Sequence, residues 1–146
     1  MIPRIEAEVR AAMKSGDARR RDTLRLVLSS LKSAEKDARE DLSDEAALAV
    51  LRRERKRRIE AADAYRAGGA EDRAALEEAE AVVIDEFLPT SLGEDEIAAI
   101  VDQAIAETGA TSPKEMGSVM RVAMARTGGR ADGKVVQAAV RARLTG

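Results

Sequence analysis

The sequence predicts an all-α protein, with an N-terminal bundle of about four helices and a small C-terminal domain of three. Apolar side chains recur at helical spacing along the chain, and no stretch alternates with the period of a β-strand. Hydrophobic residues, chiefly alanine, leucine and valine, make up 45% of the 146 residues, and charged residues make up 36%. The only aromatic residues are Tyr65 and Phe87, so the composition also favours helices.

Residues 1–89 are expected to form the bundle. Pro3 suits the first turn of a helix that Gly16 ends. The buried side of this helix is expected to hold Ile5, Val9 and Met13. The second helix carries an apolar side at i, i+3, i+4 and i+7 spacing, made of Leu24, Val27, Leu28, Leu31 and Ala34.

Two more helices complete the predicted bundle. Ser43 is the expected N-cap of the third helix. Its buried side is expected to hold Leu48, Leu51, Ile59, Ala62 and Tyr65. After Gly68-Gly69 an acidic helix follows, which we expect to continue until Pro89 stops it. Its apolar side chains are Leu76, Val83, Ile84, Phe87 and Leu88.

Residues 90–93 are predicted to link the bundle to a three-helix domain over residues 94–146. The first helix of this domain carries Ile97, Ile100, Val101, Ala104 and Ile105. Ser112, Pro113 and Glu115 form a capping-box start for the second, which carries Met116, Val119, Met120, Ala123 and Met124. Asp132 is the expected cap of the last helix, which carries Val135, Val136, Ala139, Val140 and Leu144.

The composition excludes several kinds of active site. The chain has no histidine, cysteine or tryptophan. A Ser-His-Asp relay, a cysteine nucleophile and a zinc site built on imidazole or thiolate are therefore excluded. No carboxylate pair is marked out as an acid/base couple, so we expect no catalytic residues, no metal and no cofactor. We also expect no membrane span, and a soluble cytoplasmic protein.

The net charge of −2 conceals a partition along the chain. Residues 1–58 hold 16 basic and 11 acidic side chains, residues 59–96 hold 2 and 12, and residues 97–146 hold 7 and 4. Two basic segments are thus separated by an acidic one. Because local patches govern binding, the overall charge neither supports nor opposes a polyanionic partner.

The densest charge run is Arg52–Arg58, in which six of seven residues are basic. At 100° per residue, Arg53, Lys56 and Arg57 lie opposite the apolar side and point to water. They are either phosphate contacts for a nucleic acid or a solvated face paired with the acidic helix over residues 71–86. Arg55 lies on the apolar side itself, so we expect it to meet a carboxylate from a neighbouring helix.

The segment Gly128–Val135 imitates a phosphate-binding loop by its glycine spacing, but Val135 replaces the hydroxyl residue and no strand precedes it. A better interpretation is the end of one helix and the start of another at Asp132. Arg130 and Lys134 would then lie beside backbone N–H groups that donate to an RNA or protein anion. A plain turn and cap is the alternative. Lys114 is a further candidate for RNA contact.

Met116, Met120 and Met124 recur at four-residue spacing. They either fill a core or form an adaptable surface for docking a protein. Aromatic side chains for stacking on bases are scarce, so any RNA contact is expected to be with shape and phosphate.

Several segments together resemble the GatB/YqeY family. The most distinctive are Glu115–Met120 and Gly129–Lys134, in which the motif residues are Met116, Gly117, Met120, Gly129, Asp132 and Gly133. Phe87-Leu88-Pro89, and Thr23-Leu24-Arg25 with Ser29, match further parts. The order and spacing agree over nearly the full length.

The resemblance implies an all-helical protein related to the tail of the B subunit of the tRNA-dependent amidotransferase. That complex amidates glutamyl- or aspartyl-tRNA with glutamine as nitrogen donor, and its tail is thought to engage tRNA. The family's activity label is accordingly carbon–nitrogen ligation with glutamine as amido-N-donor. Because the chain resembles only the tail, we expect a tRNA-binding accessory module that is not catalytic alone, with no DNA partner. The alternatives are a module that docks on an amidotransferase or another translation protein, and participation in the amidation itself.

Overall fold

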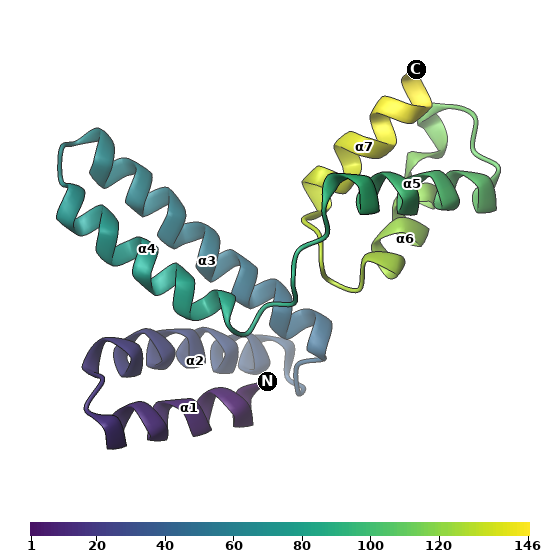
Figure 1. The fold of residues 1–146 in the computed structure, drawn as a ribbon. Helices are drawn as coiled ribbons and strands as arrows, with labels where there is room; N and C mark the ends of the chain where they lie inside the picture. Colours follow the sequence, from purple (N-terminus) through teal and green to yellow (C-terminus); the bar gives the residue numbers. More distant parts are fainter. The chain divides into compact units, whose positions relative to one another are not determined.

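The computed structural model describes residues 1–146 and is all-helical, which confirms the predicted fold class (Figure 1). Seven α-helices and one 3₁₀ turn, η1, follow one another along the chain. They are α1 (Ile2–Ser15), α2 (Ala18–Ala38), α3 (Asp44–Ala67), α4 (Glu71–Asp85), α5 (Glu94–Thr108), η1 (Pro113–Glu115), α6 (Met116–Thr127) and α7 (Gly133–Thr145). None of these helices combines the length and the apolarity that crossing a membrane requires.

The chain divides into two compact units, Met1–Leu88 and Pro89–Gly146. The first contains α1 to α4, in which α1 packs against α2 and α3 against α4 along their lengths (Figure 1). The second contains α5, η1, α6 and α7. Each unit has its own apolar core, so each buries the inner faces of its own helices.

The core of the first unit differs from expectation at Met13. Ile5 and Val9 are buried as predicted, but Met13 is 55% exposed and Ala12 occupies the inner face instead. The reason is helical phase. Measured from Ile5, position 13 is rotated by about 80° and position 12 by only about 20°. Leu76 is also exposed, and in α4 the buried positions are Ala74, Ala81 and Ile84.

The helix ends of the first unit follow local sequence signals. The Ser43 hydroxyl accepts a hydrogen bond from the backbone N–H of Ala46 at 3.1 Å, which confirms the predicted cap of α3. Gly16 ends α1 in the left-handed conformation, where glycine is favoured. An additional cap that was not predicted is Asp17, which caps α2 by accepting from the backbone N–H of Arg20 at 3.1 Å.

The prediction that the acidic helix continues to Pro89 is wrong. The helix α4 ends at Asp85, and the backbone N–H groups of Phe87 and Leu88 bond three residues back, to Ile84 and Asp85. A residue before proline is disfavoured in the α conformation, which is consistent with this early end. The tightened turn still places Phe87 in the core of the first unit.

The core of the second unit is built from small and β-branched side chains. Its fully buried members include Val101, Ala104, Val119, Ala123, Val136 and Val140. Met116, Met120 and Met124 are half-buried and pack against this core, so core filling is the correct interpretation of their spacing. Val135 was expected in the core but is exposed, because α7 turns Val136 and Val140 inward.

Residues 90–92 are bonded within the second unit. The backbone N–H of Leu92 donates to the carbonyl of Arg130 at 2.8 Å. In return, Nε of Arg130 donates to the carbonyl of Thr90 at 3.0 Å. These two bonds hold part of the predicted linker against the turn between α6 and α7.

We expect the variant Asp132→Ala to destabilise the second unit by about 1 kcal/mol, a typical value for a lost N-cap. The Asp132 carboxylate accepts from the backbone N–H of Lys134 at 2.9 Å, and alanine cannot replace this bond. Thermal unfolding followed by circular dichroism measures the effect. The variant Asp132→Asn keeps a side-chain acceptor, so it should lose much less stability than Asp132→Ala. Equal losses in the two variants would show that the cap does not stabilise α7.

Candidate nucleic-acid interface

The outer face of α3 presents the predicted basic row. Arg53, Lys56 and Arg57 are all exposed, as their helical phase predicts. The Arg57 guanidinium lies 3.2 Å from the Glu54 carboxylate, and the Lys56 ammonium lies 3.7 Å from the Glu60 carboxylate. Arg53 has no ion-pair partner. The row is therefore only partly neutralised, and by carboxylates of its own helix.

The acidic helix α4 pairs with other arginines of α3. Nε of Arg55 donates to the Asp85 carboxylate at 2.5 Å, which confirms the partner expected for Arg55. Nearer the turn between the helices, Arg66 pairs with Glu71 and Glu78, which raises the pKa of Arg66 and lowers that of Glu71. No carboxylate of α4 therefore pairs with Arg53, Lys56 or Arg57.

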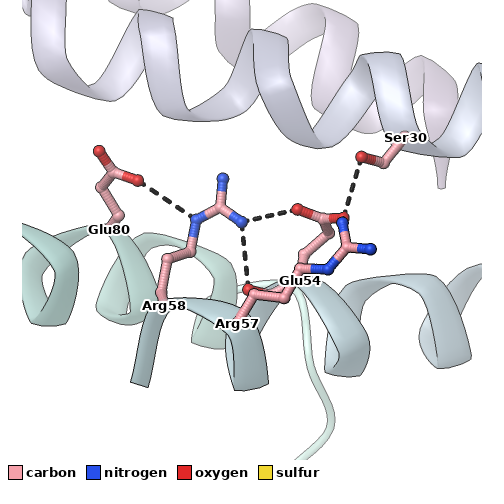
Figure 2. A network of polar contacts seen from close by, with 5 residues as sticks. All are labelled: Ser30, Glu54, Arg57, Arg58 and Glu80. Carbon is pink, nitrogen blue, oxygen red and sulfur yellow. Dashed lines mark hydrogen bonds and ion pairs between the residues drawn. The ribbon is translucent and has the colours of Figure 1, made fainter. Parts of the chain in front are cut away.

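Beneath the row lies a buried polar network that joins three helices (Figure 2). Arg58 is 7% exposed, and its Nη1 donates to the Glu54 carboxylate at 2.6 Å. Glu54 is 5% exposed, and it also accepts from the Ser30 hydroxyl of α2 at 3.0 Å. Nε of Arg58 completes the network by donating to the Glu80 carboxylate of α4 at 3.2 Å.

The charge of Glu54 is maintained by its hydrogen bonds. Burial by itself would raise the pKa of Glu54, but hydrogen bonds from Arg58 and Ser30, together with nearby positive charge, hold the pKa below its ordinary value. The positive charges of Arg58 and Arg57 act in the same direction. The ionised carboxylate is therefore the stable form inside the bundle.

This network was not predicted from the sequence. No buried partner was expected for Arg58, and Glu54 was not among the candidate residues. Helical phase was the available signal. Glu54 lies three residues after the buried Leu51, and Arg58 lies four residues before the buried Ala62, so both charges fall on the inner face of α3. Two opposite charges four residues apart on the inner face of a helix indicate a buried pair.

We expect the variant Glu54→Gln to lower stability at neutral pH by an amount that disappears in acid. A carboxyl whose pKa is lower in the folded than in the unfolded state stabilises the fold above its unfolded pKa. This contribution is lost as the pH falls below about 4.5 and passes through the folded pKa. Urea unfolding of the two proteins between pH 3 and pH 7 measures the difference. A difference that is constant over this range would contradict the assignment.

The second unit also presents exposed cations. Lys114, Arg130 and Lys134 are exposed and have no ion-pair partner. Arg130 is fixed through Nε by the carbonyl of Thr90, which leaves its two terminal nitrogens available for an external acceptor. By contrast, Arg126 is bonded to Gln103 and Glu107, and Arg143 to Asp102.

The turn between α6 and α7 brings Arg130 and Lys134 to one helix start. Gly128 and Gly129 both have positive φ, of 55° and 77°, which allows the tight turn. Asp132 then caps α7, so the segment ends one helix and begins the next, as the sequence predicts. Gly133 is the first residue of α7, and no strand precedes the turn.

The remaining motif residues form the start of α6. Met116 and Met120 lie half-buried on its inner side, and Gly117 is exposed. The carboxylate of Glu115 accepts from the backbone N–H groups of Thr111 at 2.8 Å and Ser112 at 3.0 Å. These two bonds lower the pKa of Glu115 and fix the loop that carries Lys114.

Comparison with known proteins identifies the family. No curated protein matches the sequence. The family model described as Yqey-like protein matches residues 2–144, which include nearly all of both units and every candidate residue described above. The chain therefore belongs to the family of Yqey-like proteins.

Proposed function

We propose that this protein is a free-standing accessory module that binds tRNA through phosphate contacts and catalyses no reaction alone. The observation that carries the proposal is a set of exposed cations with no intramolecular carboxylate. Among the residues predicted to contact RNA, these are Arg53 in the first unit and Lys114, Arg130 and Lys134 in the second. Exposed cations without a paired carboxylate lose the least when they exchange water and counterions for phosphates.

Arg130 is the best-prepared contact of this set. Its Nε bond to the carbonyl of Thr90 restricts the side chain, so less conformational entropy is lost when a phosphate binds. A guanidinium with two free terminal nitrogens matches a phosphate in bidentate geometry. Lys134, in the first turn of α7, adds a second positive charge at the same turn of the protein.

The two aromatic side chains are engaged inside the first unit. Phe87 is buried with the Arg4 guanidinium 4.7 Å from its ring centre, and the Arg73 guanidinium lies 5.8 Å from the ring centre of Tyr65. Stacking of bases on aromatic rings is therefore poorly supplied. This supports recognition of RNA shape and phosphates, as in the binding of folded RNA.

The resemblance to the amidotransferase tail supports tRNA as the RNA in question. Docking on an amidotransferase or another translation protein through the methionines of α6 is less well supported, because these methionines pack against the core of the second unit. The exposed cations therefore favour tRNA over a protein as the partner.

A salt titration of tRNA binding tests the proposal. If the protein makes six phosphate contacts, raising the salt concentration from 50 to 200 mM should lower its affinity for tRNA about a thousandfold. The variant Arg130→Ala/Lys134→Ala should bind more weakly and reduce the slope of log affinity against log salt by about 2. The matched control is Arg126→Ala/Arg143→Ala, which removes the same charge from residues that are already paired.

The control variant should retain more affinity than the test variant, although both have the same net charge. Absence of tRNA binding at low salt, or binding that does not respond to salt, would refute the proposal. Equal losses in the two variants would show that only net charge matters and that Arg130 and Lys134 form no site.

A further inference from the structure

An exposed methionine lies at the end of α1, where the chain turns toward α2. Met13 is 55% exposed, and together with Arg10, Ala11 and Lys14 it lines an open hollow of about 590 Å³. From α2, Nη2 of Arg25 reaches the sulfur of Met13 at 3.5 Å. The hollow therefore combines one apolar, polarisable surface with cations on both helices.

None of the cations around this methionine lies within ion-pair distance of a carboxylate. Arg10, Lys14 and Arg25 are exposed and have no ion-pair partner. Their neighbours Arg20 and Arg21 do pair, Arg20 with Glu8 and Glu86 and Arg21 with Asp22. Three cations without an ion-pair partner thus lie around the exposed methionine.

We propose that this hollow binds a single unpaired nucleotide of RNA, with phosphates at Arg10, Lys14 and Arg25 and the base against the thioether of Met13. The inference rests on the proposed function and adds a contact with a base, which the phosphate contacts elsewhere do not provide. A methionine sulfur makes favourable contacts with aromatic rings, and nucleobases present such a ring. Because Phe87 and Tyr65 already contact Arg4 and Arg73, we assign the contact with the base to the exposed thioether of Met13.

The balance of charged and apolar groups favours RNA over an acidic peptide. The hollow is lined by two cations, Arg10 and Lys14, beside the apolar Ala11 and Met13, and Arg25 brings a third cation to the sulfur of Met13. A protein docking site, by contrast, has an apolar centre and few charges at its core. Interfaces with nucleic acids are more polar and much more positively charged. A nucleotide has one base for the apolar side chains and adjoining phosphates for the cations, so it matches the groups at the hollow.

The test compares a ten-residue oligoadenylate with an abasic oligonucleotide of the same length, by fluorescence anisotropy with the full chain. The variant Met13→Ser should weaken oligoadenylate binding about 3- to 10-fold and leave binding of the abasic strand unchanged. The variant Arg10→Ala should weaken both strands and reduce the salt slope by about 1. The matched control is Leu26→Ser, since Leu26 is 56% exposed and is not one of the residues that line this hollow.

Each other outcome identifies what is wrong. If tRNA binds but Met13→Ser behaves like Leu26→Ser on oligoadenylate, the base contact is refuted and the proposed function stands. If Met13→Ser weakens binding of a leucine-containing polyglutamate peptide and spares oligoadenylate, the hollow is a protein site and the inference is overturned. If the wild-type chain binds neither tRNA nor oligoadenylate, the proposed function fails as well.

Discussion

The variant Arg58→Ala is expected to lower the free energy of unfolding of the first unit by about 3 kcal/mol. Removing the guanidinium leaves the Glu54 carboxylate buried with only Ser30 and Arg57 as donors, and breaking a buried pair from one side is strongly destabilising. Urea unfolding followed by tyrosine fluorescence isolates the effect. Tyr65 is the only tyrosine, the chain has no tryptophan, and Tyr65 lies in the first unit, so this signal reports that unit alone.

The control for Arg58→Ala is the double variant Glu54→Leu/Arg58→Met. Replacing both members of a buried ion pair with apolar side chains of similar volume is often neutral or stabilising. We therefore expect the double variant to recover most of the stability that Arg58→Ala loses. A loss below about 1 kcal/mol in the single variant, or a larger loss in the double variant, would contradict the network in Figure 2.

The variant Leu51→Ala is expected to cost about 3–5 kcal/mol of stability and to leave tRNA affinity unchanged. Leu51 is fully buried on the inner face of α3, whereas the basic row lies on the outer face of the same helix. Truncation opens a cavity under the row without removing any charge. Unfolding is again followed by tyrosine fluorescence, and affinity is measured at a temperature where the variant remains folded.

The partner variant for Leu51→Ala is Arg53→Ala. Its effect on stability should stay within about 0.5 kcal/mol because Arg53 is exposed and unpaired, but it should weaken tRNA binding. If Leu51→Ala lowers stability alone and Arg53→Ala lowers affinity alone, the inner face of α3 serves the fold and its outer face binds RNA. If Arg53→Ala leaves the affinity unchanged, α3 is not part of the RNA interface.

Local signals in the sequence were sufficient for much of the fold. Ser43 and Asp132 could be identified as caps because a cap depends on residues within one turn. Met13 was misplaced because the i+4 spacing was extended over two steps, by which point the helix has rotated away from its buried side. The early end of α4 was missed because Pro89 marks where a helix cannot continue and not where it must end.

The candidate site was predictable to the extent that it depends on helical phase. The outward direction of Arg53, Lys56 and Arg57 follows from 100° per residue. The network around Glu54 was not foreseen, since its partners Ser30 and Glu80 come from other helices. Which cations remain unpaired likewise depends on packing between helices, which a single sequence does not specify.

The buried pair has a consequence for how this bundle selects one arrangement. The buried positions of α3 and α4 include four alanines, Ala47, Ala62, Ala74 and Ala81. Apolar contacts that are hydrophobic and of about the right size stabilise a fold without selecting one packing arrangement. The Arg58 guanidinium, however, meets carboxylates of both α3 and α4 only when these helices lie in one register. We therefore expect Glu54→Leu/Arg58→Met to have broader side-chain NMR signals than the wild-type chain, because it retains its stability but loses the contacts that discriminate between neighbouring registers.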